Sequence, residues 1–124
     1  MATIPLISIV DDDVAVRNSL DDLLQSIGFR THSFASAEAF MSSNHVRDTA
    51  CLILDVRMPG MNGLDLQCQI ASTNRRIPII FVTSHADEVA RARALQHGAV
   101  AFLYKPFREG ELIKAIDAAL KQRS

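Results

Sequence analysis

Residues 51–63 read CLILDVRMPGMNG, an apolar run that stops abruptly at a carboxylate, Asp55. Four apolar residues followed by Pro and Gly turn signals are typical of a short strand that is buried on both faces. We therefore expect Asp55 where a buried strand meets solvent, at the start of a loop whose backbone is restrained by Pro59 and Gly60. A carboxylate at this place can be a nucleophile, a metal ligand or merely the N-terminal cap of a following helix.

Size and composition predict one ordinary domain, residues 1–124, that can bury a core of its own. Of the 124 residues, 48% are hydrophobic, which favours a folded chain over a disordered one. The formal net charge of −1 gives no general electrostatic reason to bind nucleic acid or an anionic membrane. The first residues lack the basic start of a signal peptide, and no apolar run is long enough to span a bilayer. We therefore expect a soluble, cytoplasmic protein.

The two cysteines, Cys51 and Cys68, lie in apolar stretches of the sequence. Two cysteines without a disulfide framework indicate a reducing compartment. Neither cysteine is spaced from a histidine as in a metal site, so we expect both to be packing residues.

Strand and helix patterns alternate along the chain. Strands are expected at residues 6–10, 30–34, 51–54, 79–83 and 101–104, and a turn at residues 74–78. Helices are expected at residues 14–27, after a cap at Ser36, and at residues 63–72, 87–97 and 109–121. One face of the first helix should be buried, through Val16, Leu20, Leu23, Leu24 and Ile27. The alternation predicts an α/β domain with a parallel sheet and right-handed crossovers. The polar strand at residues 30–34 belongs at a sheet edge.

Polar side chains gather where the predicted strands end. They are Asp11, Asp12 and Asp13 after the first strand, Asp55 after the third, Thr83 and Ser84 at the fourth, and Lys105 after the fifth. The carboxyl ends of parallel strands meet at one edge of a sheet, where functional groups collect. Crowded carboxylates repel one another unless a cation sits among them, and Mg²⁺ suits such oxygen ligands. With the metal bound, Asp55 can attack phosphorus while Lys105 and the Thr83 hydroxyl stabilise the phosphoryl oxygens.

Over essentially its whole length, the chain resembles the receiver domains of two-component response regulators. The resemblance rests on residues 9–13 (IVDDD), 55–63 (DVRMPGMNG), 80–84 (IFVTS) and 102–106 (FLYKP). Two further segments, residues 36–40 (SAEAF) and 98–102 (GAVAF), are similar to the FixJ-like group in particular. The resemblance implies a flavodoxin-like (βα)5 fold, a doubly wound sheet of five parallel strands in the order 2-1-3-4-5.

The resemblance also implies a phosphorylation site that depends on a metal. Asp55 matches the phospho-acceptor, Asp12 the direct metal ligand, and Asp11 the second acid, which holds metal-bound water. Arg57 would offer its backbone carbonyl to Mg²⁺, for which Mn²⁺ can substitute. Asp13 is an additional acid for which the resemblance supplies no role.

Further positions match the switch of the family. Thr83 resembles the hydroxyl that moves toward the phosphoryl group, and Phe102 the aromatic residue that turns inward with it, although Phe102 can also be plain core. Lys105 resembles the lysine of the site, and Pro106 would follow a cis peptide bond.

Arg57 and His85 flank the site at positions that tune the lifetime of the phosphoryl group in this family. Their bulk should hinder attack by water, which predicts a comparatively long-lived phosphoryl state. For His85, a solvated loop residue is a better interpretation than a metal ligand.

The function implied by the resemblance is a switch and not an enzyme, apart from catalysis of its own phosphorylation and dephosphorylation. A sensor histidine kinase would donate the phosphoryl group. The face formed by the helix at residues 87–97 and the strand at 101–104 would then rearrange to control a homodimer, an output domain or another partner protein, in transcription regulation in the parent protein. The weak, Ala-rich pattern of that helix suits such a movement.

Three other functions are weighed against this one. A phosphatase of the haloacid-dehalogenase type fits the Asp-x-Asp pattern of residues 11–13, but the later acids it needs are represented only by Glu109, Glu111 and Asp117, and no cap region is present. In a flavin-binding module, the acids at residues 11–13 would repel the cofactor phosphate. A receiver that binds partners without phosphorylation is the third alternative, against which the complete set of acids, Thr83 and Lys105 argues.

Overall fold

Five parallel strands form a single sheet in the order β2-β1-β3-β4-β5. They are β1 (Leu6–Val10), β2 (Arg30–Phe34), β3 (Thr49–Leu54), β4 (Ile79–Thr83) and β5 (Ala101–Tyr104). The structure, a computed structural model, describes residues 4–73 and 75–123, with no account of the side chain of residue 123. The start of the chain (residues 1–3) and the first residue of the predicted turn (residue 74) lie outside these ranges. The predicted fold and strand order are confirmed, including the edge position of polar β2.

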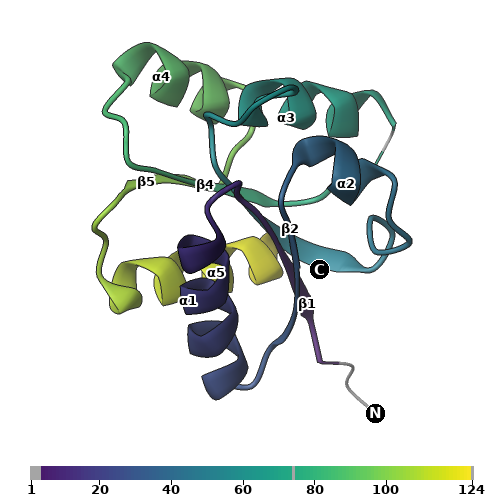
Figure 1. The fold of residues 1–124 in the computed structure, drawn as a ribbon, viewed down its shortest axis with the longest axis vertical. Coiled ribbons are helices and arrows are strands. Elements are labelled where there is room, and N and C mark those ends of the chain that lie inside the picture. Colours follow the sequence, from purple (N-terminus) through teal and green to yellow (C-terminus); the bar gives the residue numbers. More distant parts are fainter. Residues whose placement is uncertain (1–3, 74, 124) are drawn as a thin grey trace.

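Helices cover both faces of the sheet (Figure 1). On one face lie α1 (Val14–Ser26) and α5 (Glu109–Arg123); on the other lie α2 (Ala37–Met41), α3 (Gly63–Ser72) and α4 (Glu88–Gln96). Successive residues of a strand point to opposite faces, so each buried strand supplies both cores. In β3, for example, Leu52 and Leu54 pack toward α2, α3 and α4, whereas Cys51 and Ile53 pack toward α1 and α5. The predicted helices are therefore all present. None of those that the structure describes has the length and apolar character required to cross a bilayer.

Side-chain caps set the first residue of four helices. The Asp13 side chain accepts a hydrogen bond from the backbone of α1, Ser36 caps α2 as predicted, and Asp87 caps α4. In α3 the cap is reciprocal, because Asn62 and Asp65 each accept a bond from the backbone of the other. Such caps satisfy N–H groups that have no partner within the helix.

Three expectations from the sequence are wrong. Ile27 is 43% exposed, because α1 ends at residue 26 and Ile27 becomes its C-cap. Cys68 is exposed on α3, and of the two cysteines only Cys51 packs in the core. The third strand, predicted at residues 51–54, begins two residues earlier, at Thr49, whose buried hydroxyl lies 2.7 Å from that of Ser8 on the neighbouring strand.

Candidate functional site

Three carboxylates converge at the carboxyl edge of the sheet. Asp11 and Asp12 follow β1 and Asp55 follows β3, and these strands are neighbours in the sheet. One oxygen from each carboxylate lies within 4.8 Å of the others. Asp11 and Asp55 are buried, whereas Asp12 is exposed. The predicted acids are thus brought together by strand pairing, and they form a group that could hold a cation.

The surroundings of Asp55 disfavour its ionised form. Burial raises the pKa of the Asp55 carboxyl, and the neighbouring Asp11 carboxylate raises it further. Lys105 and the backbone N–H groups of Arg57 and Val56 lower the same pKa, but they do not overcome the first two effects. An ionised Asp55 is therefore held in the folded protein against an electrostatic penalty, which a bound cation would relieve.

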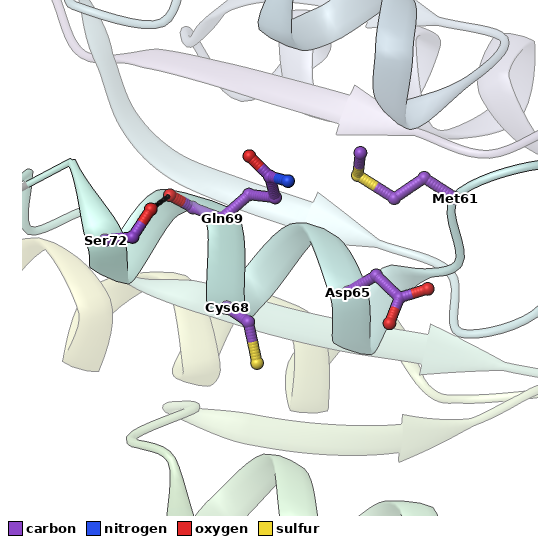
Figure 2. Close-up of a pocket in the computed structure, with 5 residues that line it drawn as sticks. All are labelled: Met61, Asp65, Cys68, Gln69 and Ser72. Carbon is purple, nitrogen blue, oxygen red and sulfur yellow. Dashed lines mark hydrogen bonds between the residues drawn. The ribbon is translucent and has the colours of Figure 1, made fainter.

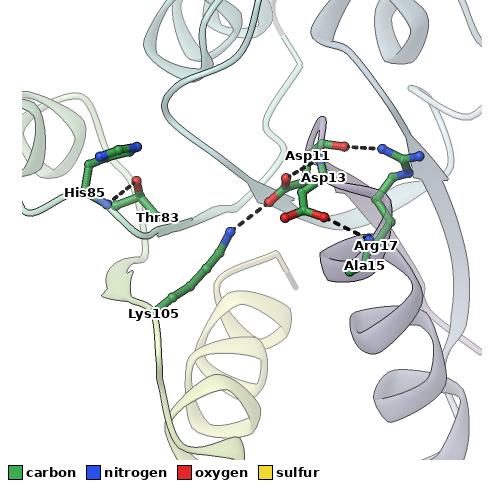
Figure 3. A network of polar contacts seen from close by, with 7 residues as sticks. All are labelled: Asp11, Asp13, Ala15, Arg17, Thr83, His85 and Lys105. Atoms are coloured by element: carbon green, nitrogen blue, oxygen red, sulfur yellow. Dashed lines mark hydrogen bonds and ion pairs between the residues drawn. The ribbon is translucent and has the colours of Figure 1, made fainter.

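Lys105 joins the acids from the end of β5. Its Nζ donates a hydrogen bond to Asp11 Oδ2 over 3.1 Å, in an ion pair that is largely shielded from water (Figure 3). Its backbone N–H donates to the carbonyl oxygen of Thr83 over 2.7 Å, and the peptide bond to Pro106 is cis. The backbone of Lys105 is therefore held at the ends of β4 and β5, from which its side chain reaches Asp11.

Asp13, the acid without a predicted role, is a helix cap. Its side chain accepts from Ala15 N–H over 2.9 Å, while its own N–H donates to Asp11 Oδ1 over 2.9 Å (Figure 3). Arg17, which the sequence did not single out, donates from Nη1 to the backbone oxygen of Asp11 over 2.7 Å. The sequence contained one signal for Arg17: it follows the cap Asp13 by four residues, and residues four apart share a helix face. Together these contacts fix the backbone that carries Asp11 and Asp12.

Thr83 and Phe102 lie in the interior. The Thr83 hydroxyl accepts the backbone N–H of His85 over 3.2 Å, and the exposed His85 is not a member of the carboxylate group (Figure 3). The Phe102 ring packs with Phe81 at a centroid distance of 5.7 Å and with Tyr104 at 5.5 Å. In this structure Phe102 is therefore part of the core, and Thr83 sits at the end of a buried strand next to the lysine.

The loop after Asp55 is held by close backbone contacts. Gly60 has a φ of 76°, a conformation that favours glycine. The next N–H, of Met61, donates to Glu38 Oε2 of α2 over 3.0 Å. A Cβ on Gly63 would overlap the backbone oxygen of Asp55 and lie 3.1 Å from a ring carbon of Phe81, so this position has no room for a side chain.

The exposed side of α3 carries a separate surface pocket of about 540 Å³. Figure 2 shows its lining residues, which come from α3 and the loop before it: Met61, Asp65, Cys68, Gln69 and Ser72. None of the three clustered carboxylates lines this pocket. It is therefore distinct from the group at the sheet edge.

Comparisons with known proteins identify the family. Residues 7–117 match the family model of the response regulator receiver domain. The chain is 44% identical over 121 residues to nodulation protein W of Bradyrhizobium diazoefficiens and 48% identical over 116 residues to response regulator protein TmoT of Ectopseudomonas mendocina. It is 38% identical over 122 residues to the transcriptional regulatory protein FixJ of B. diazoefficiens. These alignments cover 98%, 94% and 98% of this chain but 53%, 53% and 60% of the relatives, so the chain spans little more than half their length.

Solved structures agree with this assignment. The crystal structure of FixJ-N superposes with a TM-score of 0.87 at 36% identity, covering 97% of this chain and 96% of that one. The response regulator StyR superposes with a TM-score of 0.88 at 41% identity, covering 98% of this chain and 61% of that one. The chain therefore belongs to the response regulator receiver domains of two-component systems, which are signalling domains.

Proposed function

We propose that this receiver domain is a switch that is activated when Asp55 accepts a phosphoryl group from a sensor histidine kinase. One observation carries the proposal: the carboxylates of Asp11, Asp12 and Asp55 meet within 4.8 Å of one another, with Lys105 Nζ 3.1 Å from Asp11. Like charges crowded and partly buried destabilise a fold, so such a cluster at a strand edge favours a chemical role over a structural one.

The donor set fits a hard divalent cation, Mg²⁺, with Mn²⁺ as a substitute. Asp12 and Asp55 would bind it directly, Asp11 through water, and Arg57 through its backbone carbonyl. When bound, the cation would supply positive charge that offsets both the repulsion among these carboxylates and the charge of the phosphoryl donor. The raised pKa of Asp55 supports this requirement, since its ionised form lacks sufficient compensation from Lys105 alone.

In the proposed reaction, a carboxylate oxygen of Asp55 attacks phosphorus. The bond between phosphorus and the imidazole nitrogen of the kinase breaks, and its electron pair stays on that nitrogen. Lys105 and the Thr83 hydroxyl hold the oxygens of the transferred group. To reach it, Thr83 leaves the N–H of His85, and Phe102 moves into the space that Thr83 gives up.

The movement would remodel the face formed by α4 and β5. Helix α4 buries only two alanines, Ala90 and Ala94, so shifting it disturbs little packing. Receiver domains work with sensor kinases and output domains; we propose that here the remodelled face controls a homodimer or an output domain. The name of the relative FixJ, a transcriptional regulatory protein, supports a role in transcription regulation. We place that role in the cytoplasm, with residues 1–124 acting as one receiver unit. The exposed side chains of Arg57 and His85 would shield the phosphoryl group from water and prolong its lifetime.

Intact mass after incubation with Mg²⁺ and acetyl phosphate tests the proposal. We expect the mass of one phosphoryl group to be added, and to be lost in Asp55→Asn and in the presence of a chelator. Asp13→Asn is the matched control, because asparagine caps α1 equally well while one nearby carboxylate is removed; this variant should still be phosphorylated. Free phosphate released without an adduct would favour the phosphatase alternative. Neither adduct nor turnover would indicate a receiver that acts through binding alone.

A further inference from the structure

An ion pair connects the loop after Asp55 to the beginning of helix α4. Arg57 Nη2 lies 3.7 Å from Asp87 Oδ2, and the two side chains are 58% and 35% exposed. Asp87 is also the N-cap of α4, where its Oδ1 accepts the N–H of Ala90 over 3.0 Å. One carboxylate therefore contacts the phospho-acceptor loop with one oxygen and helix α4 with the other.

The first turn of α4 has few other restraints. Val89 is 80% exposed, whereas Ala90 is buried. Glu88 accepts a hydrogen bond from the Tyr104 hydroxyl over 3.2 Å and lies 3.9 Å from Arg91 in an exposed ion pair. Among the residues that the structure describes, Asp87 is the carboxylate within ion-pair distance of Arg57. In this structure the helix cap is therefore the acidic partner of the Arg57 guanidinium.

We infer that Asp87 is a positioning residue for Arg57, which leaves Asp87 for the phosphoryl oxygens once Asp55 is phosphorylated. The inference rests on the proposed phosphorylation of Asp55, two residues before Arg57. A phosphoryl group carries more negative charge than a carboxylate and offers three acceptor oxygens, which a guanidinium binds well. An exposed ion pair at 3.7 Å is weak, so losing it opposes the exchange of partners only slightly.

The exchange would couple the charge on Asp55 to α4 by a route separate from the movement of Thr83 and Phe102. The Arg57–Asp87 ion pair stabilises the unphosphorylated state, and this stabilisation is lost on phosphorylation. By linkage, removing the Asp87 charge favours the phosphorylated state by the same factor. Arg57 would then cover the phosphoryl group for a larger fraction of the time and protect it longer from water.

The test measures, in the unmodified protein and in each variant, the rate at which phosphoryl-Asp55 is lost after acetyl phosphate is removed. Asp87→Asn retains the cap but not the charge, and we expect its phosphoryl lifetime to be about two- to fivefold longer, the factor that an exposed ion pair is worth. In an Arg57→Ala background the same substitution should have no effect. Glu88→Gln is the matched control, because it removes one charge from the same turn and retains an acceptor for Tyr104; its lifetime should equal that of the unmodified protein.

Each result has a defined meaning. An unchanged lifetime in Asp87→Asn, or a change that persists without Arg57, would overturn the positioning role while leaving the proposed phosphorylation intact. A wild-type protein that forms no adduct would refute the proposed function, and the inference with it. Equal changes in Asp87→Asn and Glu88→Gln would show a general field effect of α4 charge and would also refute the inference.

Discussion

Replacing Gly63 with alanine should damage both the fold and the phospho-acceptor. Gly63 is the buried first residue of α3, and its N–H donates to the carbonyl oxygen of Val56 over 2.8 Å. An added Cβ would overlap the backbone oxygen of Asp55 and lie 3.1 Å from Phe81 Cε1. Neither the end of β3 nor the buried ring can retreat easily, so the loop that carries Asp55 must shift.

The size of the effect follows from two opposing contributions. Forcing an extra carbon into a packed site typically destabilises a protein by about 1–3 kcal/mol, and a clash with backbone belongs at the upper end. Alanine in place of glycine in a helix gains roughly 0.5–1 kcal/mol. We therefore expect Gly63→Ala to lower the free energy of unfolding by about 1–2 kcal/mol. Gly110→Ala in α5 is the control, because no atom lies within 4 Å of the added carbon; it should raise that free energy by up to about 1 kcal/mol.

Urea denaturation followed by circular dichroism at the helix band gives the free energies for both variants. Intact mass after a fixed incubation with acetyl phosphate and Mg²⁺ reports the state of Asp55. Gly63→Ala should be phosphorylated more slowly than the unmodified protein, and Gly110→Ala at the same rate. Unchanged stability and unchanged phosphorylation in Gly63→Ala would refute the argument that no side chain fits between Gly63 and the backbone of Asp55.

Three further predictions concern thiols and carboxyls. Burial raises the pKa of the Cys51 thiol to about 12, so in the native protein at pH 8 a thiol reagent should modify only exposed Cys68; reaction of two thiols before unfolding would contradict this. The hydrogen bond from Met61 N–H lowers the pKa of Glu38 below its ordinary value of 4.5, so its contribution to stability is complete above that value and disappears as pH falls through the lowered pKa. Glu38→Gln should therefore flatten the acid limb of a plot of urea midpoint against pH, and an identical limb would exclude the contribution. For Asp55 the sign is opposite: its pKa is raised above 3.8, so ionising it destabilises the metal-free fold as pH rises through the raised pKa. In a chelator at pH 7, Asp55→Asn should be more resistant to urea than the unmodified protein, and an equal or lower midpoint would count against this electrostatic penalty.

Much of the architecture was predictable because it depends on local periodicity. Strands buried on both faces appear as short apolar runs, and helices as faces repeating every three or four residues. The polar run at residues 30–34 identified the edge strand, since a polar face has no place between two helical layers. Asp11, Asp55 and Lys105 could be expected at one edge because each directly follows a strand, and the strands run parallel.

Contacts between distant elements were decided by the tertiary structure alone. The role of Asp13, which the sequence left open, is by contrast local, because its cap contact is with Ala15 two residues on. The pairing of Arg57 with Asp87 links residues 30 positions apart and depends on how the loop and α4 are placed by the packing of α3, β4 and β5. Cys68 and Ile27 were expected to be buried, yet both are exposed. Cys68 lies on the solvent side of its helix, and Ile27 is the C-cap at which α1 ends. Local patterns determine which elements form, whereas the partner of an exposed side chain depends on packing across the whole chain.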